Sequence, residues 1–202
     1  MNNIENQRIK DTYDNVAAIY DAVDWLIPTS WRRRATSLAY GQVLEVGIGT
    51  GLNLPFYSER CQEIFGIDVS PRMLSRASER APLCRGAVKL EVMDVQDLPL
   101  DSGSFDCVLA AFVFCTVPDP AKGLQECYRV LKPGGKLILL EHMGSDKKML
   151  RWAMDRLNPF AVKFMGDHIN RKTVDLVIAA GFRGQKAENL FGDIVRLIVA
   201  ER

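Results

Sequence analysis

The feature that most constrains the fold is a glycine-rich turn directly after a short apolar run. Gln42–Val46 is predicted to be a buried strand, and Gly47, Gly49 and Gly51 follow it at alternate positions. Because glycine has no Cβ atom, the chain can turn tightly here and a ligand can approach the backbone closely. In a doubly wound sheet, ligands bind where the first strand turns into the next helix. The pattern therefore predicts an open α/β sheet with a crevice at this turn, and a helix opening after it.

Six further runs are predicted to be strands, and they alternate with segments of helical periodicity. This alternation is typical of βαβ units and of a mainly parallel sheet. The last two runs are joined by a short loop, Asn189–Gly192, so they must be antiparallel, because a parallel crossover needs about a dozen residues or more. The six runs are Glu63–Asp68, Val88–Asp94, Phe105–Phe112, Lys136–His142, Phe182–Glu188 and Asp193–Ala200.

Helices are expected between these strands. Ser70 and Asp119 each precede a proline, a combination that favours an N-cap and a first helical turn. Two helices split at Asn158–Pro159 are expected after the fifth strand, and Asn170 is expected to cap a further helix that Gly181 closes. The remaining expected elements are N-terminal helices over Ile9–Val23 and Trp31–Leu38, and a turn at Pro133–Gly135.

We therefore predict a three-layer, Rossmann-like α/β fold with a seven-stranded, mainly parallel sheet and an antiparallel last strand. A chain of 202 residues has the size of one domain and can bury a substantial core. Its expected parts are N-terminal cap helices (1–40), a binding core (41–145), a helical cap (146–181) and the final strands (182–202).

Composition excludes several classes of protein. Lys and Arg number 26 against 25 Asp and Glu, so the net charge of +1 gives no general attraction to nucleic acid. The five cysteines are odd in number and form no CxxC pair, so neither a disulfide framework nor a metal site is expected. The N-terminus lacks the apolar region of a signal peptide. The longest apolar run, Val108–Val117, is far shorter than the roughly 20 residues of a membrane span. We expect a cytoplasmic protein.

The spacing of the glycines indicates the kind of ligand. Dinucleotide-binding turns have the pattern GxGxxG, whereas the glycines here follow GxGxG. Glu45, just before the turn, would repel a pyrophosphate and would suit a ligand with a positive amino group. Asp68 lies 68 − 51 = 17 residues after Gly51, near the spacing of an acid that binds ribose hydroxyls. Asp68 could instead cap the next helix, but Ser70 is better placed for that role.

The third predicted strand adds polar and apolar groups to the same crevice. Asp94 ends this strand and could accept a hydrogen bond from an adenine amino group, while Val95 offers a backbone contact. Val69 and Met73 could sandwich the adenine ring. For Met73, plain core packing is an equally good interpretation.

In order and spacing, LEVGIGTG, GIDVSPRML, MDVQDLPL, SFDCVLAAF and RVLKPGGKLILLEH resemble the motifs of class I S-adenosylmethionine-dependent methyltransferases. The resemblance covers about residues 40–145. It implies S-adenosylmethionine as cofactor and S-adenosylhomocysteine as product. It also implies that the backbone near Ala111 faces the methionine part of the cofactor. The implied cofactor residues are Glu45, Gly47, Gly49, Gly51, Asp68, Asp94 and Val95.

The N-terminal pattern YDxxAxxYD, which contains Tyr13 and Tyr20, resembles the start of quinone-biosynthesis methyltransferases and of bacterial phosphatidylethanolamine N-methyltransferases. The resemblance implies that this helix covers the cofactor, with Tyr13 near it and Tyr20 at the reacting groups. An ordinary amphipathic helix is the alternative. The stretch from Arg151 to Thr173 also resembles membrane-associated small-thiol methyltransferases, whose N-terminal membrane anchor is not expected in this chain.

Candidate catalytic residues follow the fourth and fifth strands. His142 titrates near neutrality and could accept a proton from the methyl acceptor, with Glu141 beside it. Its alternative is a structural histidine after a strand. His168, next to Asp167, is the only other histidine. Three residues after the fourth strand are expected to line an acceptor pocket or to pack in the core: Phe112, Phe114 and Cys115.

The segment between Asp146 and Lys172 is rich in methionine and aromatic residues and carries seven basic residues against three acidic ones. It could lie on an anionic membrane, cover a hydrophobic substrate or form a packed lid with a solvated face.

We predict a methyltransferase acting on a hydrophobic or amphiphilic small acceptor, with a phospholipid amine as the first candidate. The alternatives are a small thiol, a quinol, or a non-catalytic S-adenosylmethionine-binding partner of a complex. The expected partners are the acceptor and an anionic inner membrane face, and not nucleic acid.

Overall fold

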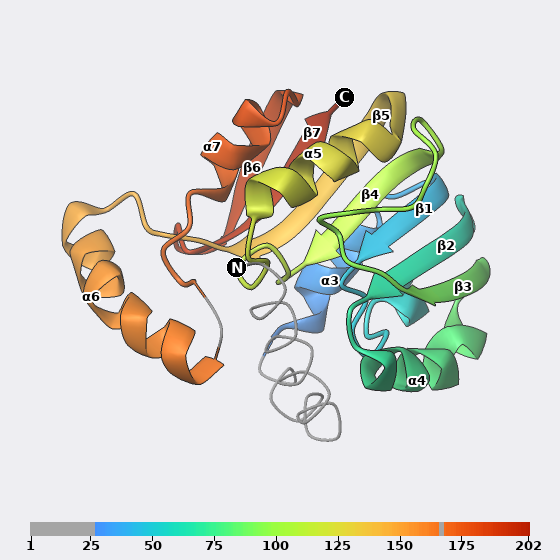
Figure 1. The fold of residues 1–202 in the computed structure, drawn as a ribbon, viewed down its shortest axis with the longest axis horizontal. Coiled ribbons are helices and arrows are strands. Elements are labelled where there is room, and N and C mark those ends of the chain that lie inside the picture. Colours follow the sequence, from blue (N-terminus) through green and yellow to red (C-terminus); the bar gives the residue numbers. More distant parts are fainter. Residues whose placement is uncertain (1–26, 166–167) are drawn as a thin grey trace.

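The computed structural model describes residues 27–165 and 168–202. The predicted helix at Ile9–Val23, with Tyr13 and Tyr20, lies outside the described residues, as does Asp167. In the described part, seven strands form one sheet in the order β3-β2-β1-β4-β5-β7-β6 (Figure 1). The strands are β1 (Gly41–Val46), β2 (Cys61–Asp68), β3 (Ala87–Val92), β4 (Phe105–Ala111), β5 (Leu131–His142), β6 (Arg183–Phe191) and β7 (Val195–Glu201).

The first five strands run parallel to one another, and β7 is antiparallel to both β5 and β6. The predicted mixed, mainly parallel sheet is therefore confirmed. The final hairpin does not simply extend the sheet. β7 inserts between β5 and β6, which leaves β6 at the edge.

Strand side chains alternate between two apolar layers because successive residues point to opposite faces of the sheet. In β1, Leu44 packs with α5 (Pro120–Val130) and α7 (Thr173–Ala179), whereas Val43 packs with α3 (Thr29–Thr36) and α4 (Pro71–Arg80). In β4, Val108 and Leu109 divide in the same way. Helices thus cover both faces, which gives the three predicted layers.

Two helices begin as the sequence predicts. The Ser70 hydroxyl accepts a hydrogen bond from the Met73 amide at 3.1 Å, and Pro71 stands in the first turn of α4. The Asp119 carboxylate accepts from the Lys122 amide at 3.0 Å, and Pro120 begins α5. Each side chain satisfies one of the amides that a helix start leaves without a partner within the helix.

The prediction of a helix directly after the glycine turn is wrong. The segment between Gly51 and Cys61 forms only a short 3₁₀ turn, η1 (Leu54–Phe56), with Pro55 inside it. A second 3₁₀ turn, η2 (Ala81–Leu83), follows α4. Because the segment is short and its proline donates no backbone hydrogen bond, it has no room for a full helix before β2 begins.

The prediction that Asn158–Pro159 splits the helical cap is also wrong. Helix α6 (Lys148–Met165) runs through Pro159 without interruption, at the left of the view in Figure 1. A proline removes one helical hydrogen bond, which often bends a helix without ending it.

Asn170 does not cap α7, contrary to the prediction. Its amide instead donates to the Asp155 carboxylate at 2.8 Å, which ties α6 to the following loop.

The expected turn at Pro133–Gly135 lies inside β5, which starts immediately after α5 at Leu131. The register against β4 shifts at this point, and Gly134 has a positive φ of 75°. The proline and glycines therefore form an irregular part of the strand rather than a separate connection. Among the helices of the described ranges, none is long and apolar enough to cross a membrane.

Candidate active site

A pocket opens at the carboxyl ends of four adjacent strands, β3, β2, β1 and β4. Its space measures about 740 Å³ when the adjoining open solvent is included. Two carboxylates line it, and its described lining contains no lysine or arginine. The lining residues are Val46, Gly47, Gly49, Ile67, Asp68, Val69, Met73, Met93, Asp94, Val95, Gln96, Ala111, Phe112, Val113, Thr116, Val117 and Pro118.

The glycine turn has the backbone conformation that the sequence suggests. Gly47, Gly49 and Gly51 have φ values of 60°, 57° and 80°, in the left-handed region that favours glycine. A Cβ atom on Gly47 would lie 2.6 Å from the Val113 side chain, so this glycine permits a close approach between two loops. A Cβ atom on Gly49 would meet only the Gly47 carbonyl oxygen, at 3.9 Å. The backbone at Gly49 is therefore open to a ligand in the pocket.

Asp68 joins the turn to the end of β2. One carboxylate oxygen accepts from the Gly49 amide at 3.0 Å, and the other accepts from the Ser70 amide at 2.9 Å. The side chain is half-buried and lines the pocket. Its role in binding ribose hydroxyls stays a prediction, and Ser70, not Asp68, caps α4.

Asp94 and Gln96 form the polar part of the wall after β3. The Asp94 carboxylate accepts from both the backbone and the side-chain amides of Gln96, at 2.9 and 3.0 Å. The Gln96 carbonyl oxygen accepts from the Asp119 amide at 2.9 Å, which links this wall to the start of α5. No local sequence pattern marks Gln96, because its role depends on a contact with the start of α5.

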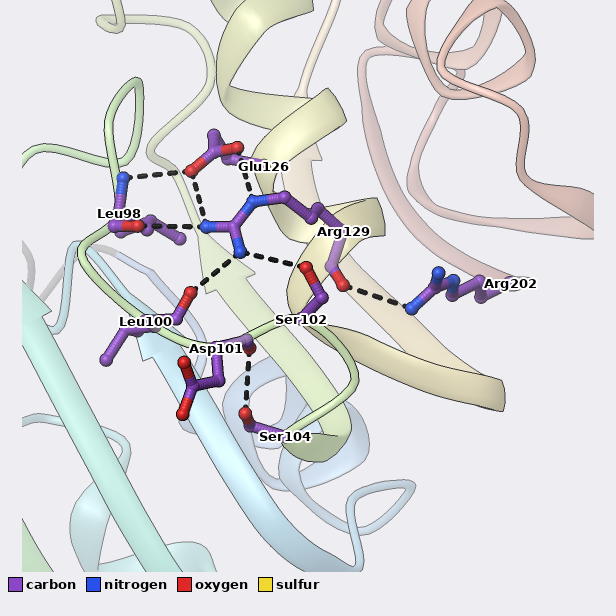
Figure 2. Close-up of polar contacts among 8 residues, drawn as sticks. All are labelled: Leu98, Leu100, Asp101, Ser102, Ser104, Glu126, Arg129 and Arg202. Atoms are coloured by element: carbon purple, nitrogen blue, oxygen red, sulfur yellow. Dashed lines mark hydrogen bonds and ion pairs between the residues drawn. The ribbon is translucent and has the colours of Figure 1, made fainter.

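An ion pair on α5 holds the loop that follows this wall. Figure 2 shows the Arg129 guanidinium donating to the Leu98 and Leu100 carbonyls, at 2.9 and 2.7 Å, and to Glu126 at 2.8 Å. Glu126 in turn accepts from the Leu98 amide at 3.0 Å. The guanidinium lowers the pKa of Glu126, so the pair stays charged. The loop that follows Asp94 is thus fixed to α5 through the Leu98 and Leu100 carbonyls and the Leu98 amide.

The segment after β4 forms the opposite wall and is strained at Phe112. This residue has a φ of 59°, the one non-glycine residue with a positive φ among those that the structure describes. Strained residues of this kind cluster at functional sites, where surrounding contacts hold them in place. Glu141 provides such contacts: its carboxylate accepts from the Val113 and Phe114 amides at 2.8 and 3.0 Å. The Arg171 guanidinium binds the Phe114 carbonyl at 2.6 Å.

These contacts change the interpretation of Glu141. Its side chain is fully buried and is engaged by two backbone amides of the wall, so it does not fit the predicted place beside the reacting groups. We interpret Glu141 as a positioning residue for the Phe112–Val113 wall. Phe112 lines the pocket as predicted, whereas Phe114 and Cys115 are buried in the interior.

His142 ends β5 at the same edge of the sheet, is half-buried, and is absent from the pocket lining. One ligand atom each from Cys115, Glu141 and His142 lies within 4.8 Å of the others, so this group is where a metal ion could be held in the described chain. Cysteine spacing in the sequence did not suggest it. The His168 amide donates to the Cys115 carbonyl at 3.0 Å, which brings the second histidine to this segment.

Glu45 is buried away from the pocket rather than facing the ligand. Its carboxylate accepts from the Asn53 amide at 2.7 Å and the Tyr57 hydroxyl at 2.8 Å. Burial raises the pKa of Glu45 to about 7. The two hydrogen bonds and the charge of Arg32 lower this pKa, but their effect is smaller than that of burial. The predicted direct contact with an amino group therefore does not fit this position. Asn53 and Tyr57 flank η1, so Glu45 holds the end of the glycine turn.

We expect this buried acid to make stability depend on pH. Its pKa is higher in the folded protein than the ordinary 4.5, so folding favours the protonated form. The resulting stabilisation is present below pH 4.5 and is lost as the pH rises through about 7, a loss of about 3 kcal/mol. Glu45→Gln should remove this dependence. Urea unfolding of both proteins across this range measures the difference, and parallel curves would contradict the burial effect.

Eight of the ten predicted cofactor residues that the structure describes line the pocket, and two do not. Gly51 packs instead against α4, where a Cβ atom would lie 3.0 Å from the Ala77 backbone. Glu45 is buried beside η1, and Tyr13 lies outside the described residues. The eight that line the pocket are Gly47, Gly49, Asp68, Val69, Met73, Asp94, Val95 and Ala111.

The pocket fits an adenosine ligand with a positive sulfonium better than one with phosphates. Asp68 offers carboxylate oxygens to ribose hydroxyls, and apolar Val69 and Met73 offer faces to a base. Its two acids would repel a pyrophosphate, and the described lining supplies no cationic side chain to offset them.

Comparisons with known proteins agree with this geometry. Residues 44–139 match a family model described as a methyltransferase domain. A ubiquinone/menaquinone biosynthesis C-methyltransferase UbiE from Geotalea uraniireducens is 31% identical over 98% of this chain and 97% of its own length. A phosphatidylethanolamine N-methyltransferase from Cereibacter sphaeroides is 38% identical over 64% of this chain. The match spans 66% of that relative, slightly under two thirds of its length.

Among solved structures, an S-adenosylmethionine-dependent methyltransferase from Thermotoga maritima has the same fold. Its TM-score is 0.73, with 22% identity over 95% of this chain and 98% of the other. The described chain is a Rossmann-like domain with an acid-lined pocket at the carboxyl ends of its parallel strands. The chain belongs to the S-adenosylmethionine-dependent methyltransferases, whose cofactor is S-adenosylmethionine.

Proposed function

We propose that this protein transfers a methyl group from S-adenosylmethionine to the amine of a phospholipid headgroup. The observation that carries the methyl-transfer part is the acid-lined pocket at the glycine turn, with Asp68 and Asp94 on adjacent strand ends. The choice of acceptor is supported by the similarity to the Cereibacter phosphatidylethanolamine N-methyltransferase.

The cofactor supplies a methyl group that is already activated on a positive sulfur. The protein must therefore mainly hold the two reactants in line and exclude water. Asp68 and Asp94 are proposed to hold the nucleoside, and the Phe112–Val113 wall is proposed to orient the acceptor. An ammonium group must lose a proton before its nitrogen lone pair can form the new bond to carbon as the bond to sulfur breaks. We propose His142 as the group that accepts this proton.

A quinol is the second candidate acceptor. The similarity to the Geotalea UbiE protein extends over 98% of this chain, which is more of the chain than the phosphatidylethanolamine enzyme matches. A quinol is also amphiphilic, so the apolar lining next to Phe112 suits it too. The two candidates differ in the atom that is methylated, nitrogen or carbon, and an assay can separate them.

The decisive experiment offers isotope-labelled S-adenosylmethionine with three acceptor pools: phosphatidylethanolamine vesicles, reduced demethylated quinones and small alkyl thiols. We expect label in the lipid fraction, and none with Asp68→Ala as the inactive control. Label in quinols alone would replace the lipid by the second candidate. Label in thiols alone would contradict both, and label in no pool would contradict the acceptor classes proposed here.

We expect His142→Ala to lower turnover about 100-fold or more, the usual contribution of a positioned base. The affinity for S-adenosylhomocysteine should stay within about twofold, because His142 is not part of the pocket lining. A matched control is His168→Ala, which changes the other histidine of the chain. Initial rates and calorimetry measure the two quantities. Full activity of the His142 variant would exclude it as the base.

A further inference from the structure

Helix α6 presents an apolar face to solvent. Its sequence contains four basic residues and one acidic residue. Met154 is the one hydrophobic side chain of its described part that is buried, at 7% exposure. Other large apolar side chains of the helix are exposed, although water disfavours such a surface. They are Met149 at 87%, Trp152 at 62%, Leu157 at 58% and Phe160 at 63%.

Three of these exposed residues lie on one side of the helix, whereas Leu157, three residues after Met154, lies nearer the buried side. Met149, Trp152, Arg156 and Phe160 follow at intervals of three and four, so they form one row about 16 Å long. The Arg156 guanidinium covers the Trp152 ring, 4.9 Å from its centre. The row therefore combines aromatic, aliphatic and cationic groups on a single exposed stripe.

The opposite side of α6 connects to the rest of the protein. Arg151 pairs with Asp155 at 3.4 Å, and the Asn170 amide binds the same carboxylate at 2.8 Å. The one acid of the helix, three residues after Trp152, is thus engaged by a cation and an amide. Lys147 and Lys148 are exposed at the start of the helix, so positive charge borders the row at this end.

We propose that this face of α6 docks on the surface of an anionic lipid bilayer. Aromatic and aliphatic side chains favour the boundary between headgroups and acyl chains, and tryptophan favours it in particular. Lysines beside such a row attract anionic headgroups, and Arg156 has a stem long enough to place its charge in the headgroup layer. The apolar row suits the boundary of the acyl chains, and the cations that border it suit the anionic headgroups.

A second copy of the chain fits this face less well. In a symmetric dimer the same patch would face itself, so the Arg156 guanidinium and the lysines would be brought toward their own copies. A bilayer brings opposite charge instead. The inference concerns where the protein binds and needs no methyl transfer, so its failure would be distinct from failure of the proposed acceptor.

The first test is co-sedimentation of the full chain with vesicles. One set is pure phosphatidylcholine, and in the other phosphatidylglycerol replaces part of it. We expect binding to the anionic vesicles only, with weakening as ionic strength rises from about 0.1 M to about 1 M, which shortens the screening length from about 10 Å to about 3 Å. Equal binding to neutral vesicles, or no binding to the anionic ones, would overturn the proposal.

Paired variants distinguish vesicle binding through this row from nonspecific hydrophobic adsorption. Trp152→Ser with Phe160→Ser should lower vesicle affinity about tenfold or more, as the row would lose its two aromatic rings. The control is Leu83→Ser with Phe191→Ser, two equally exposed side chains on η2 and β6, at 60% and 63%. All variants should keep the wild-type affinity for S-adenosylhomocysteine. If both pairs bind vesicles like the wild type, the face does not dock on lipid.

The charges are tested in the same way. Lys147→Gln with Lys148→Gln should lower affinity about fivefold per lysine on anionic vesicles. The control pair Lys122→Gln with Lys186→Gln removes two exposed lysines elsewhere and should bind as the wild type does. Equal losses in both pairs would mean that net charge, and not this face, governs binding, and would overturn the proposal.

Tryptophan fluorescence locates the contact directly. The chain has three tryptophans, and Trp152 is the one on α6. Anionic vesicles should shift the emission of the wild type to shorter wavelength, and Trp152→Phe should lose this shift while still binding. The same shift in the variant would overturn the proposal. The proposal would also be overturned if sedimentation equilibrium shows a dimer that Trp152→Ser with Phe160→Ser converts to a monomer while lipid binding stays unchanged.

Discussion

Asp68→Ala is expected to lower the affinity for S-adenosylhomocysteine about 100-fold or more. The half-buried carboxylate lines the pocket and also accepts from the Gly49 and Ser70 amides, at 3.0 and 2.9 Å. Alanine would remove a charged acceptor from the predicted ribose position and leave two backbone amides without it. Hydrogen bonds to a charged group contribute about 1.5–3 kcal/mol each. The loss of the two bonds predicted between Asp68 and the ribose hydroxyls would therefore account for this change in affinity.

Calorimetric titration with S-adenosylhomocysteine measures the effect of the Asp68 change, and urea unfolding shows how much of it comes from a disturbed turn. Asp68→Asn keeps one neutral acceptor and should lose less affinity than the alanine variant. The matched control is Asp97→Ala, an exposed carboxylate that does not line the pocket. Unchanged affinity in the Asp68→Ala protein would remove the ribose assignment.

Glu141→Ala is expected to have the largest effect on stability, a loss of about 3 kcal/mol or more. The carboxylate is fully buried and binds the Val113 and Phe114 amides at 2.8 and 3.0 Å. Removing it would leave buried amide groups without their acceptor, which costs about 1–3 kcal/mol for each. The strained backbone at Phe112 depends on the same anchor, so cofactor affinity should fall as well.

The conservative change Glu141→Gln distinguishes positioning from proton transfer. A glutamine carbonyl can accept from both amides, so this variant should recover most of the stability and most of the turnover. Chemical denaturation and initial rates measure the two quantities. A glutamine variant that is stable but inactive would instead make Glu141 a proton-transfer group, as first predicted from its place beside His142.

The strands and their parallel order could be predicted because local patterns determine them. Buried runs such as Phe105–Ala111 have few alternatives to a strand covered on both faces. The caps at Ser70 and Asp119 are also local, because the side chain and the amide it binds are three residues apart. The glycine turn and Asp68 follow from fixed spacing, which explains why most of the predicted pocket residues line the observed pocket.

The rest of the site depends on contacts between distant residues. Arg129 fixes the Asp94 loop from about 30 positions further along the chain, and Glu141 anchors a wall formed by Val113. The spacing rules used here describe neighbours along the chain, so they contain no sign of such partners. The burial of Glu45 beside Tyr57 was missed for the same reason: its sequence context shows an acid at a turn but not the side chains above it.

The sequence by itself determined the chain of strands and helices, the glycine turn and the acids at the strand ends, since hydrophobic period and turn chemistry act over a few residues. Only the tertiary structure decided that β7 enters between β5 and β6, that α6 continues through Pro159 with an exposed apolar face, and that Glu45 and Glu141 support the site from within. These features depend on which surfaces pack together and which polar groups lose water, and that is settled only when the whole chain folds.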